Sequence, residues 1–324
     1  MNKNSKGTFI LSLDTELAWG NIDKPISFEK NKKYYYITRE KVIDALLKLM
    51  EEYDIKATWA LVGHLFLESC GPWGEIKHPE IPRSPCSWYK KDWFSLDPGT
   101  NINEDPIWYG RDIIEKIIRD PVEHEIASHS FSHLIFNEEM SKSTVKADLQ
   151  KCVQIAKEMD IDLKSFIFPR HIIGFLEELN QAGFKAFRGG EPTWYSKMKM
   201  PALLVKFSHI IDQTLAISPP VVSPGMNAGM VEIPRSMQLL PKNSFRFLIP
   251  NKSRKTKALK GIRKAVKEKK IFHFWFHPYN IATSPRGLLN VLEEVFKEVN
   301  YYRKKDMIDV KTVAEVTKEY LQEN

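Results

Sequence analysis

The chain has 324 residues, of which 43% are hydrophobic and 27% charged, and a formal net charge of +7. This composition is that of a globular protein with ample apolar material for a core, and the absence of a run of about 18 apolar residues excludes a predicted membrane span. The three cysteines are widely spaced and form no CxxC pair, so the sequence favours neither a disulfide framework nor a thiolate zinc site. A metal ion would then need histidine and carboxylate ligands.

The N-terminal sequence MNKNSKGTFILSLDTE has a short apolar stretch that runs directly into acidic residues, unlike a signal peptide. We therefore expect a cytoplasmic protein, in which cysteines stay reduced. The modest net charge is not accompanied by any recognised nucleic-acid-binding motif. We expect no nucleic-acid partner.

Short apolar runs alternate with helical patterns along the chain. This alternation is typical of an α/β protein with a mainly parallel sheet. The length favours one domain, residues 1–324, folded as a single barrel of βα units; an open doubly wound sheet is the alternative. In both folds, chemistry collects at the carboxyl ends of the strands. The predicted strands are 8–14, 57–63, 124–128, 166–169, 184–188 and 271–276, and the predicted helices are 39–53, 110–118, 142–157, 173–181 and 285–299.

Two segments depart from this alternation. Residues 70–108 are rich in Trp and Pro and have little periodicity, which indicates an insertion beside the site or an excursion from the core. Residues 252–270 contain ten Lys or Arg and predict a basic amphipathic helix, which would either be a solvated surface helix or contact an anionic membrane. Flat tryptophan faces suit sugar rings, although packing within the loop is the alternative for each of them. The tryptophans of the insertion are Trp73, Trp88, Trp93 and Trp108.

Two pairs of chemically active side chains follow predicted strands. In EIASHSFSH, His129 ends a strand-like run and His133 follows four residues later, so on a helix both imidazoles would share one face and could bind one ion. In SLDTE, Asp14 closes the first strand, and Glu16 shares its face if the strand stays extended. Buried acids need a partner, a hydrogen bond or a metal. The alternatives are a chance pair of surface histidines, and acids that cap a helix or pair with arginine.

Two further motifs also stand at strand ends. HFWFHP places His277 last in its strand, while FPRH places Arg170 where its fork of donors could orient an acid. For HFWFHP, the alternative is a histidine buried in the core, which suits His273 better than His277. A surface arginine after a strand is the alternative for Arg170.

Taken in order, these motifs resemble those of the polysaccharide deacetylase superfamily, also called carbohydrate esterase family four. HSFSH matches the family's His-Ser/Thr-x-x-His motif residue by residue at His129, Ser130 and His133. SLDTE stands in place of the acidic motif, FPRH resembles the motif with an arginine near proline, and FWFHP matches the motif with a strand-end histidine. RGGEPTWY, with Trp194, stands for the aromatic motif. The resemblance spans residues 14–277.

The resemblance implies a distorted (β/α) barrel and a metal-dependent hydrolase that removes an N-acetyl group from an amino sugar in a saccharide or polysaccharide precursor. It implies one divalent ion, which we expect to be zinc, bound by His129 and His133 together with a carboxylate. Asp14 would act as the base and His277 as the acid that protonates the leaving amine. The remaining implied roles are orientation of Asp14 by Arg170 and packing of Trp194 against the sugar or His277.

The chain departs from the family pattern after Asp14. The family has two adjacent aspartates, the first a base and the second a metal ligand, but here the second position is Thr15. A neutral hydroxyl is a poor replacement for a carboxylate ligand. We expect Glu16 to be the ligand, because it is longer and shares a face with Asp14; alternatively Asp14 is the ligand and the base lies elsewhere or is absent. The rival functions are an N-deformylase or another amidase using the same site, and a catalytically inactive glycan-binding homologue.

Overall fold

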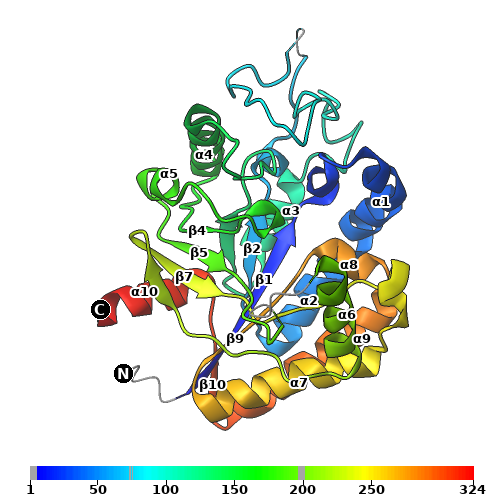
Figure 1. Cartoon of the computed structure of the whole chain (residues 1–324), viewed down its shortest axis with the longest axis vertical. Helices are drawn as coiled ribbons and strands as arrows, with labels where there is room; N and C mark the ends of the chain where they lie inside the picture. The colour runs from blue at the N-terminus through cyan, green and yellow to red at the C-terminus, as the bar shows by residue number, and fades with distance from the viewer. Residues whose placement is uncertain (1–5, 73, 75, 196–200) are drawn as a thin grey trace.

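The computed structural model describes residues 6–72, 74, 76–195 and 201–324. Among these residues, ten strands form one sheet in the order β6-β7-β5-β4-β3-β2-β1-β9-β8, and β10 pairs with β1. The sheet curls into a half-barrel with helices around it (Figure 1). The α/β barrel expectation is thus confirmed as an incomplete barrel. The strands are β1 (Gly7–Thr15), β2 (Thr58–Leu61), β3 (Glu125–Ser128), β4 (Ser165–Phe166), β5 (Ala186–Gly189), β6 (Gly225–Asn227), β7 (Met230–Pro234), β8 (Met237–Gln238), β9 (Ile271–Phe276) and β10 (Ile308–Val310).

Strand β1 lies between β2 and β9 in the sheet and is buried along its whole length. It pairs in parallel with β2, β9 and β10. Side chains alternate between the two faces of a strand. Phe9, Leu11 and Leu13 belong to the main hydrophobic core, so Ser12 and Asp14 face the inner side of the half-barrel. This alternation places an acidic side chain, that of Asp14, at the carboxyl end of β1.

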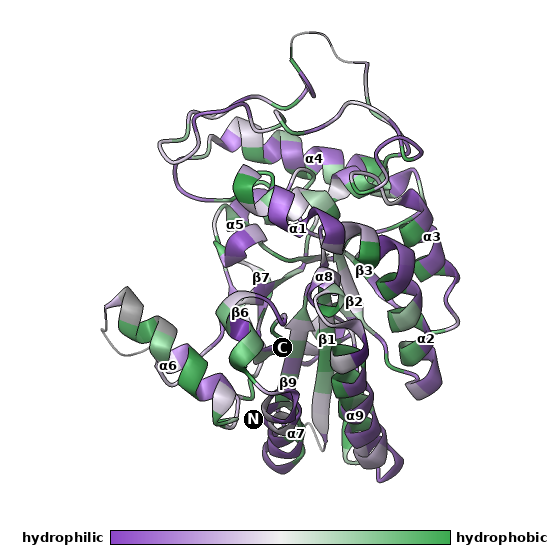
Figure 2. Cartoon of the chain, turned by 90° about the vertical axis from the view of Figure 1, so that its right-hand side faces the viewer, coloured by the Kyte–Doolittle hydropathy of each residue, from purple (hydrophilic) through white to green (hydrophobic). Residues whose placement is uncertain are grey.

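Helices cover the outer side of the sheet. Helix α9 contacts α7 and α2, and α7 packs against β1; Figure 2 shows hydrophilic residues on the outward faces of these helices. Among the other helices, α10 contacts β5 and β7, and α4 contacts α5. The helices are α1 (Pro25–Ile37), α2 (Ile43–Tyr53), α3 (Arg111–Arg119), α4 (Lys142–Lys157), α5 (Leu176–Gln181), α6 (Ala202–Thr214), α7 (Asn251–Glu268), α8 (Pro278–Ala282), α9 (Pro285–Lys304) and α10 (Val313–Glu323).

The predicted helix over 39–53 is longer in the structure. Helix α1 runs into a π-helical turn over Thr38–Val42 and then directly into α2. No helix was predicted for the residues before position 39. Only Phe28 and Tyr35 of α1 are buried, which is too few apolar positions to give a helical period in the sequence.

The basic segment 252–270 is helical as predicted and forms most of α7. Its apolar positions Ala258, Ile262 and Ala265 are fully buried inside the protein. The apolar face that suggested membrane contact is therefore already covered by the protein's own core. None of the helices in the described part of the chain is both long and apolar enough to cross a bilayer.

Segment 70–108 contains no helix and no named strand among its described residues, and it loops over the carboxyl end of the sheet (Figure 1). Trp93 and Trp108 are buried, so the packed alternative holds for these two. Trp88 is 40% exposed. Trp73 lies outside the described residues.

Candidate functional site

His129 and His133 lie on the loop after β3 rather than on a helix. Ser130 and His133 have left-handed backbone conformations, with φ of 65° and 57°, so the expected helical spacing is wrong. The loop nevertheless brings the two imidazole rings within 5.2 Å, centroid to centroid. Buried Asp148 of α4 holds the loop by accepting hydrogen bonds from the N–H group and the hydroxyl of Ser132.

Glu16 follows β1 directly and points its carboxylate at these histidines. Its Oε1 lies 3.1 Å from Nε2 of His129 and 3.2 Å from Nε2 of His133. Nε2 of His277, just after β9, lies 3.3 Å from the same oxygen. The His277 side chain is 15% exposed, whereas that of Glu16 is 6% exposed. The open side of the site is therefore at His277.

Hydrogen bonding fixes the tautomer of His129. Its Nδ1 lies 2.7 Å from the carbonyl oxygen of Ile167, which can only accept, so Nδ1 carries the proton and Nε2 keeps a lone pair. That nitrogen faces an oxygen of Glu16, also an acceptor, at 3.1 Å. Two acceptors this close repel each other unless a proton or a metal ion lies between them. A backbone carbonyl that orients the far nitrogen of a histidine is a usual feature of metal sites.

The charges of the site suit a cation. Burial alone would raise the pKa of Glu16, but His277 and His133 outweigh burial and hold this pKa well below its usual range. Burial also lowers the pKa of His133, despite the opposing effect of Glu16. An ionised carboxylate and a neutral imidazole are the states in which these side chains bind metal. Glu16, His129 and His133 thus fit the divalent ion that the fold family implies.

Asp14 is held by an arginine on the facing strand. Arg188 of β5 donates from Nη1 to Oδ1 and from Nη2 to Oδ2 of Asp14, each at 2.6 Å. Arg188 also donates to the Ser12 hydroxyl at 3.0 Å, which is hydrogen-bonded to Nε2 of His273 at 2.8 Å. Burial would raise the pKa of Asp14, but Arg188 outweighs burial and holds it well below its usual range. Asp14 is therefore an ionised carboxylate in a fixed orientation.

Arg170 does not contact Asp14 as expected. Its Nη2 donates to Oδ1 of Asp23 at 2.5 Å and to the carbonyl oxygen of Gly20 at 3.0 Å. Arg170 lies in a short turn after β4 with φ of 55°, and this turn directs its side chain to the segment that follows β1. The predicted pairing is thus corrected: Arg188 orients Asp14, and Arg170 braces the turn beside Glu16.

The aromatic neighbours of His277 are Trp275 and Tyr279, not Trp194. The ring centroids of Trp275 and His277 are 5.6 Å apart, and the guanidinium of Arg188 lies 4.5 Å from the centroid of the Trp275 ring. Trp194 is 47% exposed and donates from Nε1 to Asp212 at 3.0 Å. The expectation that Trp194 packs on His277 is therefore corrected, because the two-residue period of β9 places Trp275 there instead. The alternative, that Trp194 packs against the sugar, stays a prediction.

The contribution of Arg188 could not be recognised from the motifs. The available signal was a charged residue inside the strand-like run FKAFRG, since a buried arginine needs an acidic partner. Trp275 had a clearer signal, because it lies two positions before His277 in HFWFHP and so shares its face.

Part of the chain matches a known sequence family. Residues 26–173 match the family described as polysaccharide deacetylase. This range contains residues 129–133, here called the histidine loop, and Arg170, but neither the acidic motif nor His277. No curated protein matches the chain.

Solved structures show the same fold over almost the whole chain. A putative polysaccharide deacetylase from Mycobacterium smegmatis is 13% identical with a TM-score of 0.63, the match covering 98% of this chain and 92% of that one. A probable polysaccharide deacetylase from Pseudomonas aeruginosa PAO1 is 11% identical with a TM-score of 0.58, over 98% and 91%. Puue allantoinase is 10% identical with a TM-score of 0.57, over 97% and 89%. The family resemblance and the half-barrel fold are both confirmed.

Proposed function

We propose that this protein is a metal-dependent carbohydrate N-deacetylase. Residues 26–173 match the polysaccharide deacetylase family, and the fold of such proteins extends over nearly the whole chain. The observation that carries this proposal is the convergence of three imidazole nitrogens on one oxygen of Glu16, at 3.1, 3.2 and 3.3 Å. Near this Glu16 oxygen lies a second carboxylate, that of Asp14, which is hydrogen-bonded to Arg188. A site of this composition supports amide hydrolysis.

The ion would be held by Glu16, His129 and His133, and we expect zinc, which accepts nitrogen and oxygen ligands of this kind. Bound there, it would act as a Lewis acid toward an acyl carbonyl and would acidify a water molecule. Asp14 is a poor competitor for the ligand role, because both of its oxygens accept hydrogen bonds from Arg188. This contact supports the choice of Glu16 over Asp14.

Asp14 would be the base that takes a proton from the attacking water. Its carboxylate lies two residues before Glu16 and next to His277, with 3.9 Å between its Oδ2 and Nε2 of His277. Arg188 keeps this carboxylate ionised and fixes the direction of its oxygens. A base that needs no reorientation saves the entropy of positioning.

His277 would donate a proton to the amine that leaves. It lies on the open side of the site, where its side chain is 15% exposed. Burial would lower the pKa of His277, but Glu16 and then Asp14 outweigh burial and raise it. A raised pKa favours the protonated imidazole that an acid catalyst requires.

The substrate would be a saccharide that contains an acylated amino sugar. The rival acyl group, formyl, would use the same residues, and an inactive glycan-binding protein would keep the fold without turnover. The expected cytoplasmic location stays a prediction, which cell fractionation would test.

Acetate release from N-acetylated oligosaccharides tests the proposal directly. We expect release that stops on chelation and returns with zinc, and that collapses in His129→Ala/His133→Ala. A panel of N-formyl and N-acetyl substrates separates deformylase from deacetylase. Glycan binding without any acyl release, by protein that contains metal, would overturn the enzymatic proposal.

A further inference from the structure

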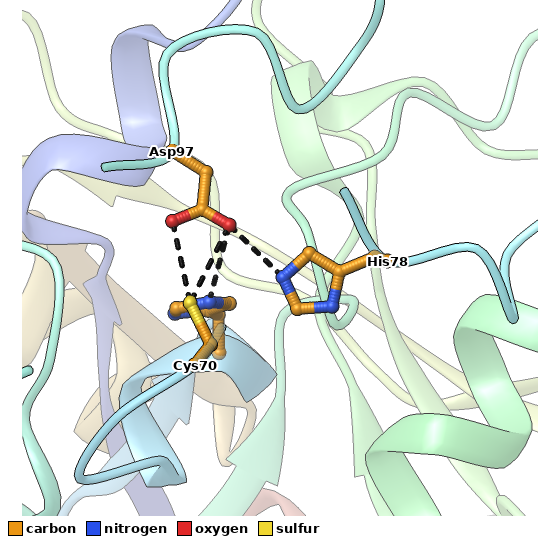
Figure 3. Close-up of side chains that lie close together, drawn as sticks. Cys70, His78 and Asp97 are labelled. Atoms are coloured by element: carbon orange, nitrogen blue, oxygen red, sulfur yellow. Dashed lines mark hydrogen bonds and ion pairs between the residues drawn. The ribbon is translucent and has the colours of Figure 1, made fainter. Parts of the chain in front are cut away.

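A second group of metal-binding side chains lies outside the proposed hydrolase site. It consists of His64, Cys70, His78 and Asp97, here called the second cluster, whose ligand atoms all lie within 4.8 Å of one another. His64 belongs to the short turn after β2, and the other three lie in segment 70–108. Figure 3 shows Cys70 and His78 directed at the carboxylate of Asp97.

The distances in the second cluster approach those of a tetrahedral zinc site. Oδ2 of Asp97 lies 3.0 Å from Nε2 of His78, 3.8 Å from Nε2 of His64 and 3.6 Å from Sγ of Cys70. Zinc bonds of about 2.0–2.3 Å place tetrahedral ligands about 3.3–3.8 Å apart. Small side-chain movements would therefore close the cluster around one ion.

The surroundings orient these ligands. Nδ1 of His64 lies 3.2 Å from the carbonyl oxygen of Trp108, so it carries the proton and leaves Nε2 with a lone pair directed into the cluster. That Nε2 is buried and has no hydrogen-bond partner among the described residues. Nδ1 of His78 lies 3.3 Å from Oε1 of Glu80, which leaves its Nε2 for the cluster. A buried nitrogen without a partner is costly unless something unseen binds it.

We propose that His64, Cys70, His78 and Asp97 bind a structural zinc ion. All four side chains are at most 8% exposed, and four protein ligands leave no open position for a substrate, as in other structural zinc sites. This proposal revises the expectation from the cysteine spacing. The ligands are spread over 34 positions with no CxxC, so the thiolate could be recognised only in three dimensions.

The ion would explain how segment 70–108 is held without regular secondary structure. Three of its ligands come from this segment and the fourth from the turn after β2, so one ion would fasten the loop to the sheet. Metal binding then contributes folding free energy at this point.

The second cluster also adjoins the proposed hydrolase site. The ring of His64 packs on Trp19, with centroids 4.3 Å apart, and Trp19 lies in the turn that follows Glu16. The N–H of His64 donates to the carbonyl of Phe131, within the histidine loop, at 2.8 Å. The zinc would therefore support both the Glu16 turn and the His129–His133 loop.

Zinc content of the full chain tests the stoichiometry. We expect two ions per chain in the unaltered protein and one in Cys70→Ser/His78→Gln. His129→Ala/His133→Ala should also keep one ion, so failure of the hydrolase site can be told apart from failure of the second cluster. Zinc that never exceeds one ion, and that disappears with His129 and His133, would overturn the proposal.

A spectroscopic readout avoids dependence on variants that fold poorly. Cobalt exchanged into the unaltered protein should give a sulfur-to-cobalt charge-transfer band, because the second cluster includes Cys70, whereas Glu16, His129 and His133 offer no sulfur. X-ray absorption of the zinc protein should show a zinc–sulfur distance of about 2.3 Å. Cys70→Ser should abolish the band, while Cys86→Ser, at a half-buried cysteine outside the cluster, should keep it. Absence of a sulfur signal in fully loaded unaltered protein would also overturn the proposal.

Discussion

Arg188 donates one hydrogen bond to each carboxylate oxygen of Asp14, both at 2.6 Å. The contact joins β5 to β1 across the inner side of the half-barrel. A bidentate pair of this kind fixes both the charge and the direction of the carboxylate. In the proposed reaction, the contact with Arg188 gives the two acidic residues different roles: Asp14 acts as the base, and Glu16 binds the metal.

Replacing Arg188 with lysine should therefore impair turnover more than metal binding. Lysine keeps the charge but cannot bond both oxygens at once, so Asp14 would rotate and kcat should fall by about 100-fold. Kinetics and zinc content, measured together, check this. Arg263→Lys, at an exposed arginine paired with Glu298, is the control and should leave kcat unchanged. Equal loss of zinc and activity in Arg188→Lys would contradict the division of roles.

Glu16→Gln and Asp14→Asn should have opposite consequences for metal binding. Glu16→Gln removes the ionised ligand, so zinc affinity should fall by more than about 100-fold, beyond the loss expected from an outer hydrogen-bond partner. Asp14→Asn should keep zinc but lose acetate release. Competition with a chromophoric chelator measures the affinity. If Asp14→Asn loses the zinc and Glu16→Gln keeps it, the ligand is Asp14.

Gly20→Ala should disturb the site through a single methyl group. A Cβ at Gly20 would lie 1.8 Å from Oε2 of Glu16, so the carboxylate must turn away from its histidines. Zinc affinity should fall by about 10–100-fold, as when an orienting partner is lost. Gly225→Ala is the matched control, because a Cβ there meets nothing within 4 Å. Unchanged affinity in Gly20→Ala would mean that Glu16 is not needed in its observed position.

Stability should decline in mild acid because of His273. Burial lowers the pKa of His273 to about 3, whereas the unfolded chain binds that proton below about pH 6.5. Between these values the unfolded state holds one more proton, so the free energy of unfolding falls by about 1.4 kcal/mol for each unit that the pH drops. The stability that neutral, buried His273 contributes is fully present above about pH 6.5.

His273→Gln does not titrate and should reduce that slope. Urea unfolding of both proteins between neutral pH and about pH 5 measures it. The difference between the two slopes isolates His273 from the other buried histidines. Parallel pH dependences in the two proteins would show that His273 is not a source of the acid sensitivity.

The sequence predicted the elements whose residues repeat with a clear period. Strands β1 and β9 are largely apolar runs, and α4 begins and ends as predicted, at Lys142 and Lys157. Helix α1 was missed because only two of its residues, Phe28 and Tyr35, are buried. Periodicity reports burial, and an element that buries little leaves little signal.

The sequence motifs predicted which side chains meet around Glu16. They did not predict which arginine contacts Asp14, because that contact joins two strands far apart in the sequence. Glu16, His129, His133 and His277 meet as their motifs indicated. The assignment of an arginine to Asp14 was wrong, because the curl of the sheet decides that β5 rather than the turn after β4 faces β1. Local sequence carries no information on that curl.

The carbonyl oxygen of Trp108 accepts hydrogen bonds from Nε1 of Trp19, at 3.1 Å, and from Nδ1 of His64, at 3.2 Å. One backbone atom at the far end of segment 70–108 thus orients two buried rings from other parts of the chain. Segment 70–108 is therefore not a module that could be exchanged freely between related proteins. A transplanted or shortened loop of any sequence would have to return a carbonyl group to this point, or the residues around it would need to be redesigned with it.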